Sequence, residues 1–478
     1  MSDPVYLVVD IGVLSIFLLG IWWFRSPALA RLGSLAVAVA LIVGAAAALM
    51  RTPLEGSIGH LVVILIAMAI GSTLGAIVAG RVNMTWIPAM VALQNGAGGL
   101  AAALVSLVEL TRSSGDASML DLGRLGGMLG LTIGVLTFSG SLIATGRLAN
   151  WLRSSATVLP RHNVLAGGLL GTLVIGVCVG LIFSDLSPLP LVIGLGTLAI
   201  ALGIVMAIRV GGADMPVLIS FLNALSGLAA AFCGVAIGSR LLTACGATVS
   251  ASGLILTHAM CLAMNRSWRS ILWAATPASV ASRPAAQATS QQETRDQSPE
   301  DQAVEALQQA EKIMIVPGYG LALANAQGPV VQLAETLTRM GKETKFAIHP
   351  IAGRMPGHMH VLLAEADVDP DLLFDLAEIN SAFAQTDLAM IVGACDVVNP
   401  SAIEAAGTPI SGMPILLAHE AKRVLICNLD LQPGYSGVDN PLYQDARAIL
   451  LLGDAKENLN RLIDRLADAS GREEGPGD

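Results

Sequence analysis

Nine long apolar segments most strongly constrain what this chain can fold into. Each holds about 20 residues, the length that an α-helix needs to cross the roughly 30 Å hydrocarbon core of a bilayer. The segments lie near 5–24, 33–50, 58–80, 87–109, 127–146, 164–184, 188–208, 215–237 and 241–264. Charged residues make up only 13% of the chain, about half the share that is typical of soluble domains. We therefore expect residues 1–265 to form a multi-pass α-helical membrane bundle of about nine transmembrane helices in the lipid bilayer.

The arginines between these segments predict the orientation of the bundle. If the C-terminal side is cytoplasmic, the cytoplasmic loops contain Arg25, Arg31, Arg81, Arg147, Arg153, Arg161 and Arg209. The loops on the other side then contain only Arg51, Arg112, Arg124 and Arg240. Because positive residues are enriched in cytoplasmic loops, this distribution predicts that the C-terminal part of the chain is cytoplasmic.

Cysteine spacing and charge exclude several classes of function. The six cysteines show no CxxC or other metal-ligand spacing, so we expect buried free thiols and no metal site. The net charge is −9, and no basic patch supports binding to nucleic acid. The chain also contains 50 glycines and few aromatic residues, a composition that favours close helix contacts in a membrane.

The sequence changes character after the last apolar segment. Residues 266–302 are rich in Ala, Ser, Pro and Gln, cannot bury enough apolar surface to fold alone, and are expected to form a flexible linker. Residues 303–478 alternate helical and strand patterns, which predicts an α/β Rossmann-like doubly wound domain. The expected strands are 313–316, 344–348, 388–392, 424–427 and an edge strand at 448–452, with helices at 304–310 and 330–340.

One turn in this domain has the pattern of a dinucleotide-binding unit. An apolar run ends in Pro317-Gly318-Tyr319-Gly320 and continues into a helix-forming segment. Without side chains at Gly318 and Gly320, a pyrophosphate could approach the backbone at the positive end of that helix. The motif alone is a weak signal. Its place after a membrane domain, however, indicates a nucleotide-binding domain attached to a membrane-spanning domain.

Polar side chains within the apolar segments are energetically costly, so each needs a structural or functional explanation. The fourth segment contains Asn95, and Asp214 precedes the eighth, which contains Ser220, Asn223 and Ser226. Their three-residue spacing places the last three on one helix face. That face could hold water and relay protons, or it could only hydrogen-bond to neighbouring helices. Asp214 could cap the helix N-terminus or act as a gate toward the soluble domain.

Longer blocks of sequence carry a family resemblance. In the last domain they are Ile348-His349-Pro350-Ile351-Ala352-Gly353-Arg354-Met355-Pro356-Gly357-His358-Met359, Gly393-Ala394-Cys395-Asp396-Val397-Val398-Asn399-Pro400, Gly412-Met413-Pro414 and Pro433-Gly434-Tyr435-Ser436-Gly437. In the membrane part they are Gly212-Ala213-Asp214-Met215-Pro216 and Met264-Asn265-Arg266-Ser267. With the Gly-x-Gly turn and nine apolar segments, these blocks make nearly the whole chain resemble the beta subunits of proton-translocating nicotinamide nucleotide transhydrogenases.

The resemblance implies an energy-coupled oxidoreductase. Residues 303–478 would bind NADP(H), and an alpha subunit with additional transmembrane helices would supply the NAD(H) domain. Hydride transfer from NADH to NADP⁺ would be coupled to inward proton translocation across the bacterial inner membrane. The family also implies a dimer of alpha–beta units, with no activity for this chain alone.

The resemblance also implies residues for each part of the reaction. The proton pathway would include Asn95, Asp214, Asn223 and Ser226. The cofactor site would include Gly318, Tyr319, Gly320, Ala322, Leu323, Ala352, Gly353, Arg354, Gly393, Asp396, Asn399, Asn428, Leu429, Asp430, Gly434, Tyr435 and Ser436. From the residues alone, Arg354 could instead be an ordinary loop arginine and Asp396 a turn-former. The segment 434–437 could be a simple turn, where the family has a lid over the nucleotide.

Two departures from the family pattern bear on mechanism and cofactor. Many members have a membrane histidine where this chain has Asn95, and another branch has asparagine, with the histidine thought to come from a partner subunit. His258 and His60 are the titratable groups nearest the bilayer and could relay protons or be solvated or packed. Where the family usually has Lys-Arg-Ser to hold the 2′-phosphate, this chain has Asn428-Leu429-Asp430. An acidic group near the ribose normally favours NAD, so Asp430 indicates a possible NAD(H) preference.

Two further interpretations remain open from the sequence. The chain could be a membrane transporter gated by nucleotide binding, although it shows no convincing internal repeat of the kind that transporters have. Alternatively, the soluble domain could keep the fold and prefer NAD(H).

Overall fold

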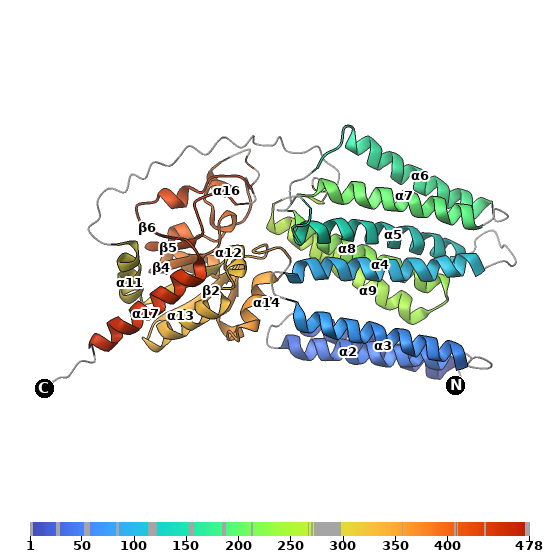
Figure 1. Cartoon of the computed structure of the whole chain (residues 1–478), viewed down its shortest axis with the longest axis horizontal. Helices are drawn as coiled ribbons and strands as arrows, with labels where there is room; N and C mark the ends of the chain where they lie inside the picture. The colour runs from blue at the N-terminus through green and yellow to red at the C-terminus, as the bar shows by residue number, and fades with distance from the viewer. Residues whose placement is uncertain are drawn as a thin grey trace. The chain divides into compact units, whose positions relative to one another are not determined.

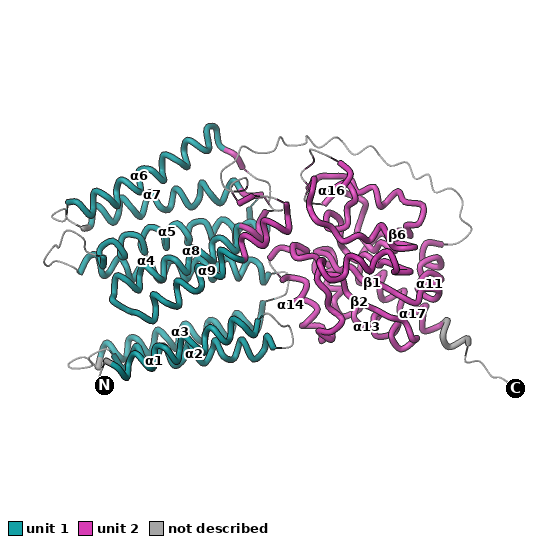
Figure 2. Tube along the Cα trace, turned by 180° about the vertical axis from the view of Figure 1, so that it is seen from behind, with its two compact units in different colours: residues 1–154, 159–209, 218–255 teal, residues 155–158, 210–217, 256–478 magenta. Residues whose placement is uncertain are grey.

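The protein is described from a computed structural model (Figure 1). The structure describes residues 3–24, 29–51, 58–82, 86–112, 122–152, 157–183, 188–211, 214–265, 267–268, 271, 298–355, 357–405, 408, 410–434 and 436–473. The chain divides into two compact units, coloured separately in Figure 2. One unit comprises residues 1–154, 159–209 and 218–255, and the other comprises 155–158, 210–217 and 256–478. Most of the expected linker lies outside the described residues.

Nine helices among the described residues are long and apolar enough to cross a membrane. They are α1 (Asp3–Trp23), α2 (Ala30–Arg51), α3 (Ile58–Arg81), α4 (Ile87–Arg112), α5 (Leu122–Leu148), α6 (His162–Ile182), α7 (Pro188–Arg209), α8 (Met215–Ala236) and α9 (Arg240–Ala263). Their number and order confirm the predicted multi-pass bundle. Each predicted segment overlaps one helix.

Glycine contacts bring the central helices of this bundle close together. A Cβ atom on Gly99 of α4 would lie 2.8 Å from the carbonyl oxygen of Gly134 on α5, too close for any residue but glycine. Small residues of this kind let transmembrane helices approach backbone to backbone. The central helix α5 also buries a row of hydroxyl side chains, at Thr132, Thr137, Ser139, Ser141 and Thr145.

The C-terminal domain contains a parallel sheet of six strands in the order β3-β2-β1-β4-β5-β6. The strands are β1 (Lys312–Pro317), β2 (Glu343–Ile348), β3 (Leu373–Asp375), β4 (Leu388–Val392), β5 (Arg423–Asn428) and β6 (Ala448–Leu452). This is the classical doubly wound order, in which the direction of winding reverses between β1 and β4. The Rossmann-like prediction is confirmed, including β6 as an edge strand.

Both faces of the sheet are covered. Met314 and Val316 share a buried cluster with Phe383 and Leu416, which belong to the connections after β3 and β4. Since side chains alternate along a strand, Ile313 faces the other side, and it is fully buried. The helices of the domain are α11 (Pro299–Gln309), α12 (Tyr319–Leu323), α13 (Gln327–Arg339), α14 (His358–Glu365), α15 (Leu376–Ile379), α16 (Ser401–Glu404) and α17 (Ala455–Glu473). Of these, α11, α13 and α17 lie side by side (Figure 1).

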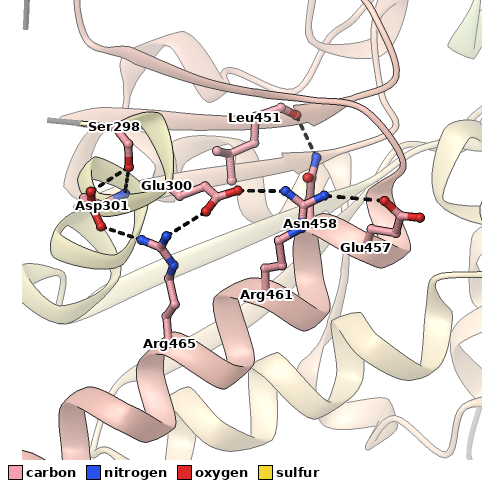
Figure 3. Close-up of polar contacts among 8 residues, drawn as sticks. All are labelled: Ser298, Glu300, Asp301, Leu451, Glu457, Asn458, Arg461 and Arg465. Atoms are coloured by element: carbon pink, nitrogen blue, oxygen red, sulfur yellow. Dashed lines mark hydrogen bonds and ion pairs between the residues drawn. The ribbon is translucent and has the colours of Figure 1, made fainter.

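Ion pairs join the first and last helices of this domain, as Figure 3 shows. Glu300 on α11 pairs with Arg461 at 2.8 Å and with Arg465 at 2.9 Å, both on α17. Asp301 pairs with Arg465 and also accepts a hydrogen bond from the Ser298 hydroxyl at 2.6 Å. We call these residues the α11–α17 clamp. It fixes the start of the domain to its C-terminal helix.

Candidate functional site

The turn after β1 meets the turn after β4 at the point where the winding of the sheet reverses. The Gly318 amide donates to the Val392 carbonyl at 2.8 Å, and the Gly320 amide donates to the Gly393 carbonyl at 2.8 Å. Ligands of open α/β sheets bind outside the carboxyl ends of the strands at this point. The structure therefore brings three of the predicted cofactor residues together at the expected place.

The glycines at this junction have a structural role that the sequence did not reveal. A Cβ atom on Gly318 would collide with the Gly393 carbonyl oxygen, and one on Gly393 would collide with the Leu321 amide nitrogen. Gly393 also has φ +69°, in the left-handed region. Thus the space beside these glycines is filled by the neighbouring turn, and their first role is the contact of two backbones.

The helix that follows the Gly-x-Gly turn is shorter than the motif suggests. It is α12, which ends at Leu323, and a new helix, α13, begins at Gln327. Ala322 is fully buried, whereas Leu323 is 55% exposed. Of these two predicted residues, only Leu323 therefore presents its side chain to the surface.

Arg354, in the loop after β2, places a cationic side chain against Tyr319 of this junction. The guanidinium carbon of Arg354 lies 4.6 Å from the ring centroid of Tyr319, a distance typical of a cation–π contact. The Arg354 amide donates to Nδ1 of His358 at 3.1 Å. Gly353 has φ +110°, and a Cβ there would collide with the His358 ring. Ala352 is buried, so this loop is held by packing as well as by hydrogen bonds.

Two buried histidines stabilise the same loop in their neutral form. Nε2 of His349 lies 2.8 Å from the Pro414 carbonyl oxygen, and Nδ1 accepts from the Ile351 amide at 3.2 Å. Burial lowers the pKa of His349 to about 4, although the bond to Pro414 opposes this shift. Burial and the Arg354 charge lower the pKa of His358 to about 4. Nε2 of His358 is buried with no hydrogen-bond partner among the described residues.

Asp396 connects the turn after β4 to the loop after β5. Its carboxylate accepts from the Ser436 amide at 3.0 Å and from the Ser436 hydroxyl at 2.5 Å. A Cβ on Gly434 would lie 2.6 Å from Oδ2 of Asp396, so glycine is needed for this approach. Asn399 is fully buried and donates to the carbonyl oxygens of Val438 and Asp439. Tyr435, also predicted here, lies outside the described residues.

The three residues at the family's 2′-phosphate position differ sharply in burial. Asn428, at the end of β5, is 7% exposed and donates to the Ala394 carbonyl and the Tyr443 hydroxyl. Its Oδ1 atom is buried with no partner among the described residues. Leu429 is 74% exposed, and exposed Asp430 accepts a local hydrogen bond from the Gln432 amide at 2.9 Å.

The nearest basic residues in sequence do not replace the missing cations. Lys422 pairs with Asp387 at 2.7 Å, next to the start of β4. Arg423 begins β5, and in a parallel sheet the starts of the strands lie at the edge opposite to the carboxyl ends. Lys422 and Arg423 therefore lie at the amino edge of the sheet, away from the loop of Asp430.

In the membrane unit, the structure links Asn95 to the eighth helix. Nδ2 of Asn95 on α4 donates to the Ile219 carbonyl on α8 at 3.3 Å. The Ser226 hydroxyl donates to the Asn223 carbonyl of its own helix at 2.8 Å. Both amide side chains are half-buried. Asn95 therefore joins α4 to α8 about one helical turn before Asn223, and we call this contact the seam between α4 and α8.

The other predicted polar groups differ in burial. Asp214 is half-buried and immediately precedes α8, with its amide donating to the Gly211 carbonyl at 3.1 Å. His60 on α3 and His258 on α9 are both exposed within this chain.

Sequence reasoning missed two hydroxyl groups at this seam. Ser106 on α4 is buried beside the thiol of Cys233 on α8, with which it shares a hydrogen bond, and Ser141 on α5 is buried with no hydrogen-bond partner among the described residues. A Cβ on Gly96, the residue after Asn95, would lie 2.8 Å from Cβ of Ser141. Buried polar groups of this kind often hold ordered water. The regular placement of hydroxyl residues along the fifth apolar segment was the available signal.

Comparison with known proteins agrees with this combination of units. The family model for the NAD(P) transhydrogenase beta subunit matches residues 6–465. The NAD(P) transhydrogenase subunit beta of Rhodospirillum rubrum is 39% identical over 427 residues, which cover 88% of this chain and 91% of the relative. The protein of that name from a defined strain of the same species matches to the same extent. A membrane bundle joined to a doubly wound domain, with a match over nearly its full length, shows that this chain belongs to the NAD(P) transhydrogenase beta subunit family.

Proposed function

We propose that this chain is the NADP(H)-binding and proton-conducting subunit of a proton-translocating transhydrogenase. In this proposal residues 303–478 bind the nucleotide, residues 1–265 conduct protons, and residues 266–302 link the two. The observation that carries it is the presence in one chain of a polar seam in a helical bundle and a parallel sheet whose glycine turns meet at the reversal point.

The residues at the sheet fit a dinucleotide. The Gly318, Gly320 and Gly393 turns lie where such ligands bind, and Arg354 adds a positive charge beside them. Nε2 of His358 remains available as a buried polar atom. When bound, NADP⁺ would supply the hydride acceptor. Asp396, through Ser436, would hold the loop after β5 in place beside it.

The proposed proton pathway follows the seam between α4 and α8. Asn95, Asn223 and Ser226 would hold water in the bundle, and Ser141 extends the polar lining to α5. Asp214 would connect this water to the side of the membrane where α8 begins. No metal is needed for such a relay, and no metal-binding cluster occurs among the described residues.

Membership in a beta subunit family implies an alpha subunit. We propose that this partner carries the NAD(H) site and further transmembrane helices, and that the complex is a dimer of alpha–beta units. The arginine distribution supports a cytoplasmic C-terminal domain in a bacterial inner membrane.

Membranes that contain this chain and its alpha subunit test the proposal. They should reduce an NADP analogue with NADH, and the rate should rise when the membrane is energised. Membranes with only one subunit serve as the control. A rate no higher than background with both subunits present would refute the proposal.

A second candidate keeps the complex but makes this site selective for NAD(H). It is favoured by exposed Leu429 and Asp430, which offer no cation to a 2′-phosphate. Isothermal titration of the soluble domain with NADP⁺ and NAD⁺ distinguishes the candidates. At least about tenfold tighter NAD⁺ binding, about 1.4 kcal/mol, supports the second candidate, and the reverse order removes it.

A further inference from the structure

One end of the membrane bundle buries an arginine against a neutral partner. Arg209, the last residue of α7, is 6% exposed. Its Nη1 atom donates to Oδ1 of Asn163, in the first turn of α6, at 2.5 Å. The Asn163 side chain is exposed. The guanidinium therefore lies directly behind a surface amide.

A second buried arginine adds positive charge at the same end. Arg147, near the end of α5, is 4% exposed and donates to the carbonyl oxygens of Ala207 at 3.4 Å and Ile208 at 2.7 Å. These carbonyls immediately precede Arg209. The N-terminus of α6 lies here too, and a helix N-terminus carries a partial positive charge.

The carbonyl ends of α5 and α7 offset part of this positive charge, and an anion would offset the charge of Arg209. Arg209 forms no ion pair among the described residues, and the Asn163 oxygen that it contacts is neutral. A buried charge is costly unless an opposite charge offsets it. A guanidinium has five N–H donors and matches the oxygens of a phosphate. An anionic oxygen beside Asn163 would complete the site.

Neighbouring residues place this end at the level of lipid head groups. Trp86, just before α4, and Trp151, just after α5, are 41% and 71% exposed, and their ring centroids lie 5.8 Å apart. Tryptophans are enriched where a membrane meets water. The outer face of α6 continues from Asn163 with exposed apolar residues, including Val164 at 71% and Ile175 at 63%. A ligand bound here would contact the polar groups around Arg209 and the apolar outer face of α6.

We propose that the ends of α5, α6 and α7 bind the phosphate of an anionic phospholipid. Arg209 is the main phosphate ligand, Arg147 and the N-terminus of α6 strengthen the positive potential, and the acyl chains lie along α6. Basic pockets between transmembrane helices are known to bind acidic lipid head groups. The α6 face distinguishes this site from one for free phosphate, which has no apolar part.

Native mass spectrometry of the full chain with added phosphatidylglycerol tests this site. The wild type should retain one tightly bound lipid, and phosphatidylcholine should not replace it. Arg209→Gln should weaken binding at least tenfold. Asn163→Asp should weaken it similarly, because the new carboxylate pairs with Arg209, and this variant keeps the charge of Arg209 satisfied even if Arg209→Gln fails to fold.

Arg161→Gln is the matched control, since Arg161 is exposed at the same end of α6. It should leave lipid retention within about twofold of wild type. Equal losses in Arg161→Gln and Arg209→Gln would show only diffuse surface charge and overturn the proposal. Displacement of the lipid by millimolar inorganic phosphate would assign the site to a free anion and also overturn it. Unchanged binding in Asn163→Asp would have the same consequence.

Discussion

Asp396 holds the loop after β5 through two hydrogen bonds to Ser436. Hydrogen bonds to a charged acceptor contribute about 1.5–3 kcal/mol when buried, and partial exposure reduces this to about 1–2 kcal/mol here. Asp396→Ala should therefore make amide hydrogen exchange at Ser436 and Val438 roughly tenfold faster. Asp439→Ala is the control, because only the backbone of Asp439 contacts Asn399. Unchanged exchange in Asp396→Ala would mean that the carboxylate does not hold this loop.

Two buried histidines make the stability of the soluble domain depend on pH. Burial lowers the pKa of both His349 and His358 to about 4, below the usual value of about 6.5. As pH falls below about 6.5, the unfolded chain takes up protons that the folded domain does not, so stability decreases with acidification. At pH 5 each histidine should cost about 2 kcal/mol relative to pH 7.

The measurement is the free energy of unfolding of residues 298–478 at pH 7 and pH 5. His349→Asn should remove about half of the difference, since asparagine does not titrate. His360→Asn should leave most of it, because His360 is partly exposed and lies beside Asp375. Equal stability of the wild type at the two pH values would contradict the assignment of neutral buried histidines.

At the scale of single residues, the sequence predicted which residues follow the carboxyl ends of strands better than it predicted their burial. Gly318, Gly393 and Asp396 lie at the carboxyl ends of strands, where short apolar runs followed by glycine placed them. Asn428 was expected beside the cofactor, and in the structure it is buried and bonded to Ala394 and Tyr443. The sequence around Asn428 does not predict its burial, because its hydrogen-bond partners belong to other segments of the chain.

The junction of the turns after β1 and β4 depends on glycine. Gly318→Ala places a methyl group against the backbone of Gly393, which cannot move without breaking the contact. Overpacking of this kind costs about 1–3 kcal/mol, and more where backbone must shift. Urea denaturation of the soluble domain should show this loss.

Gly328→Ala in α13 is the matched control for the glycine junction. A Cβ there would have no described atom within 4 Å. Because alanine favours helix more than glycine does, it should raise stability by about 0.5–1 kcal/mol. A Gly318→Ala domain as stable as wild type would show that the two turns do not pack as described.

The α11–α17 clamp should weaken in acid and in salt. The Ser298 hydroxyl, with a contribution from Arg465, holds the pKa of Asp301 below its usual value. The stabilisation is therefore present above about pH 4 and is lost as Asp301 protonates. Since the pairs are exposed, about 1 M salt should also screen them.

Hydrogen exchange in α11, corrected for the intrinsic effect of pH, measures the clamp. Arg465→Gln should increase exchange at neutral pH and reduce the response to salt, while the pair of Glu300 with Arg461 remains. Arg339→Gln on α13, where the guanidinium donates to the Thr336 hydroxyl of its own helix, should change neither. The soluble fragment used here must begin before Glu300, because a fragment that begins at residue 303 would lack the carboxylates of Glu300 and Asp301. The same exchange in wild type and Arg465→Gln would refute a stabilising clamp.

At the scale of elements, apolar pattern predicted the long helices and the buried strands. β3 escaped notice because it has three residues, none of them fully buried. The helix α17 was missed although Leu459, Leu462, Ile463 and Leu466 recur with helical spacing and are buried. The pairing order of the strands is non-local and required the structure, as did the contact between Asn95 and α8.

At the scale of the whole molecule, the proposal joins two kinds of chemistry in one chain. In this proposal the sheet would supply a nucleotide site, and the bundle would supply a polar seam that has few groups able to carry charge among the described residues. Asn95 cannot bind a proton near neutral pH, so the proposed relay needs water, a partner subunit's group, or both. The proposal then predicts that nucleotide binding in one unit changes proton access in the other.

The most direct measurement follows hydride transfer and lumen pH together, in vesicles reconstituted with this chain and its alpha subunit. With the nucleotide domains outside, transfer from NADH to an NADP analogue should make the lumen alkaline, and an uncoupler should abolish that pH change. Asn223→Leu should reduce both signals in parallel. Hydride transfer at full rate without any change in lumen pH would contradict the account.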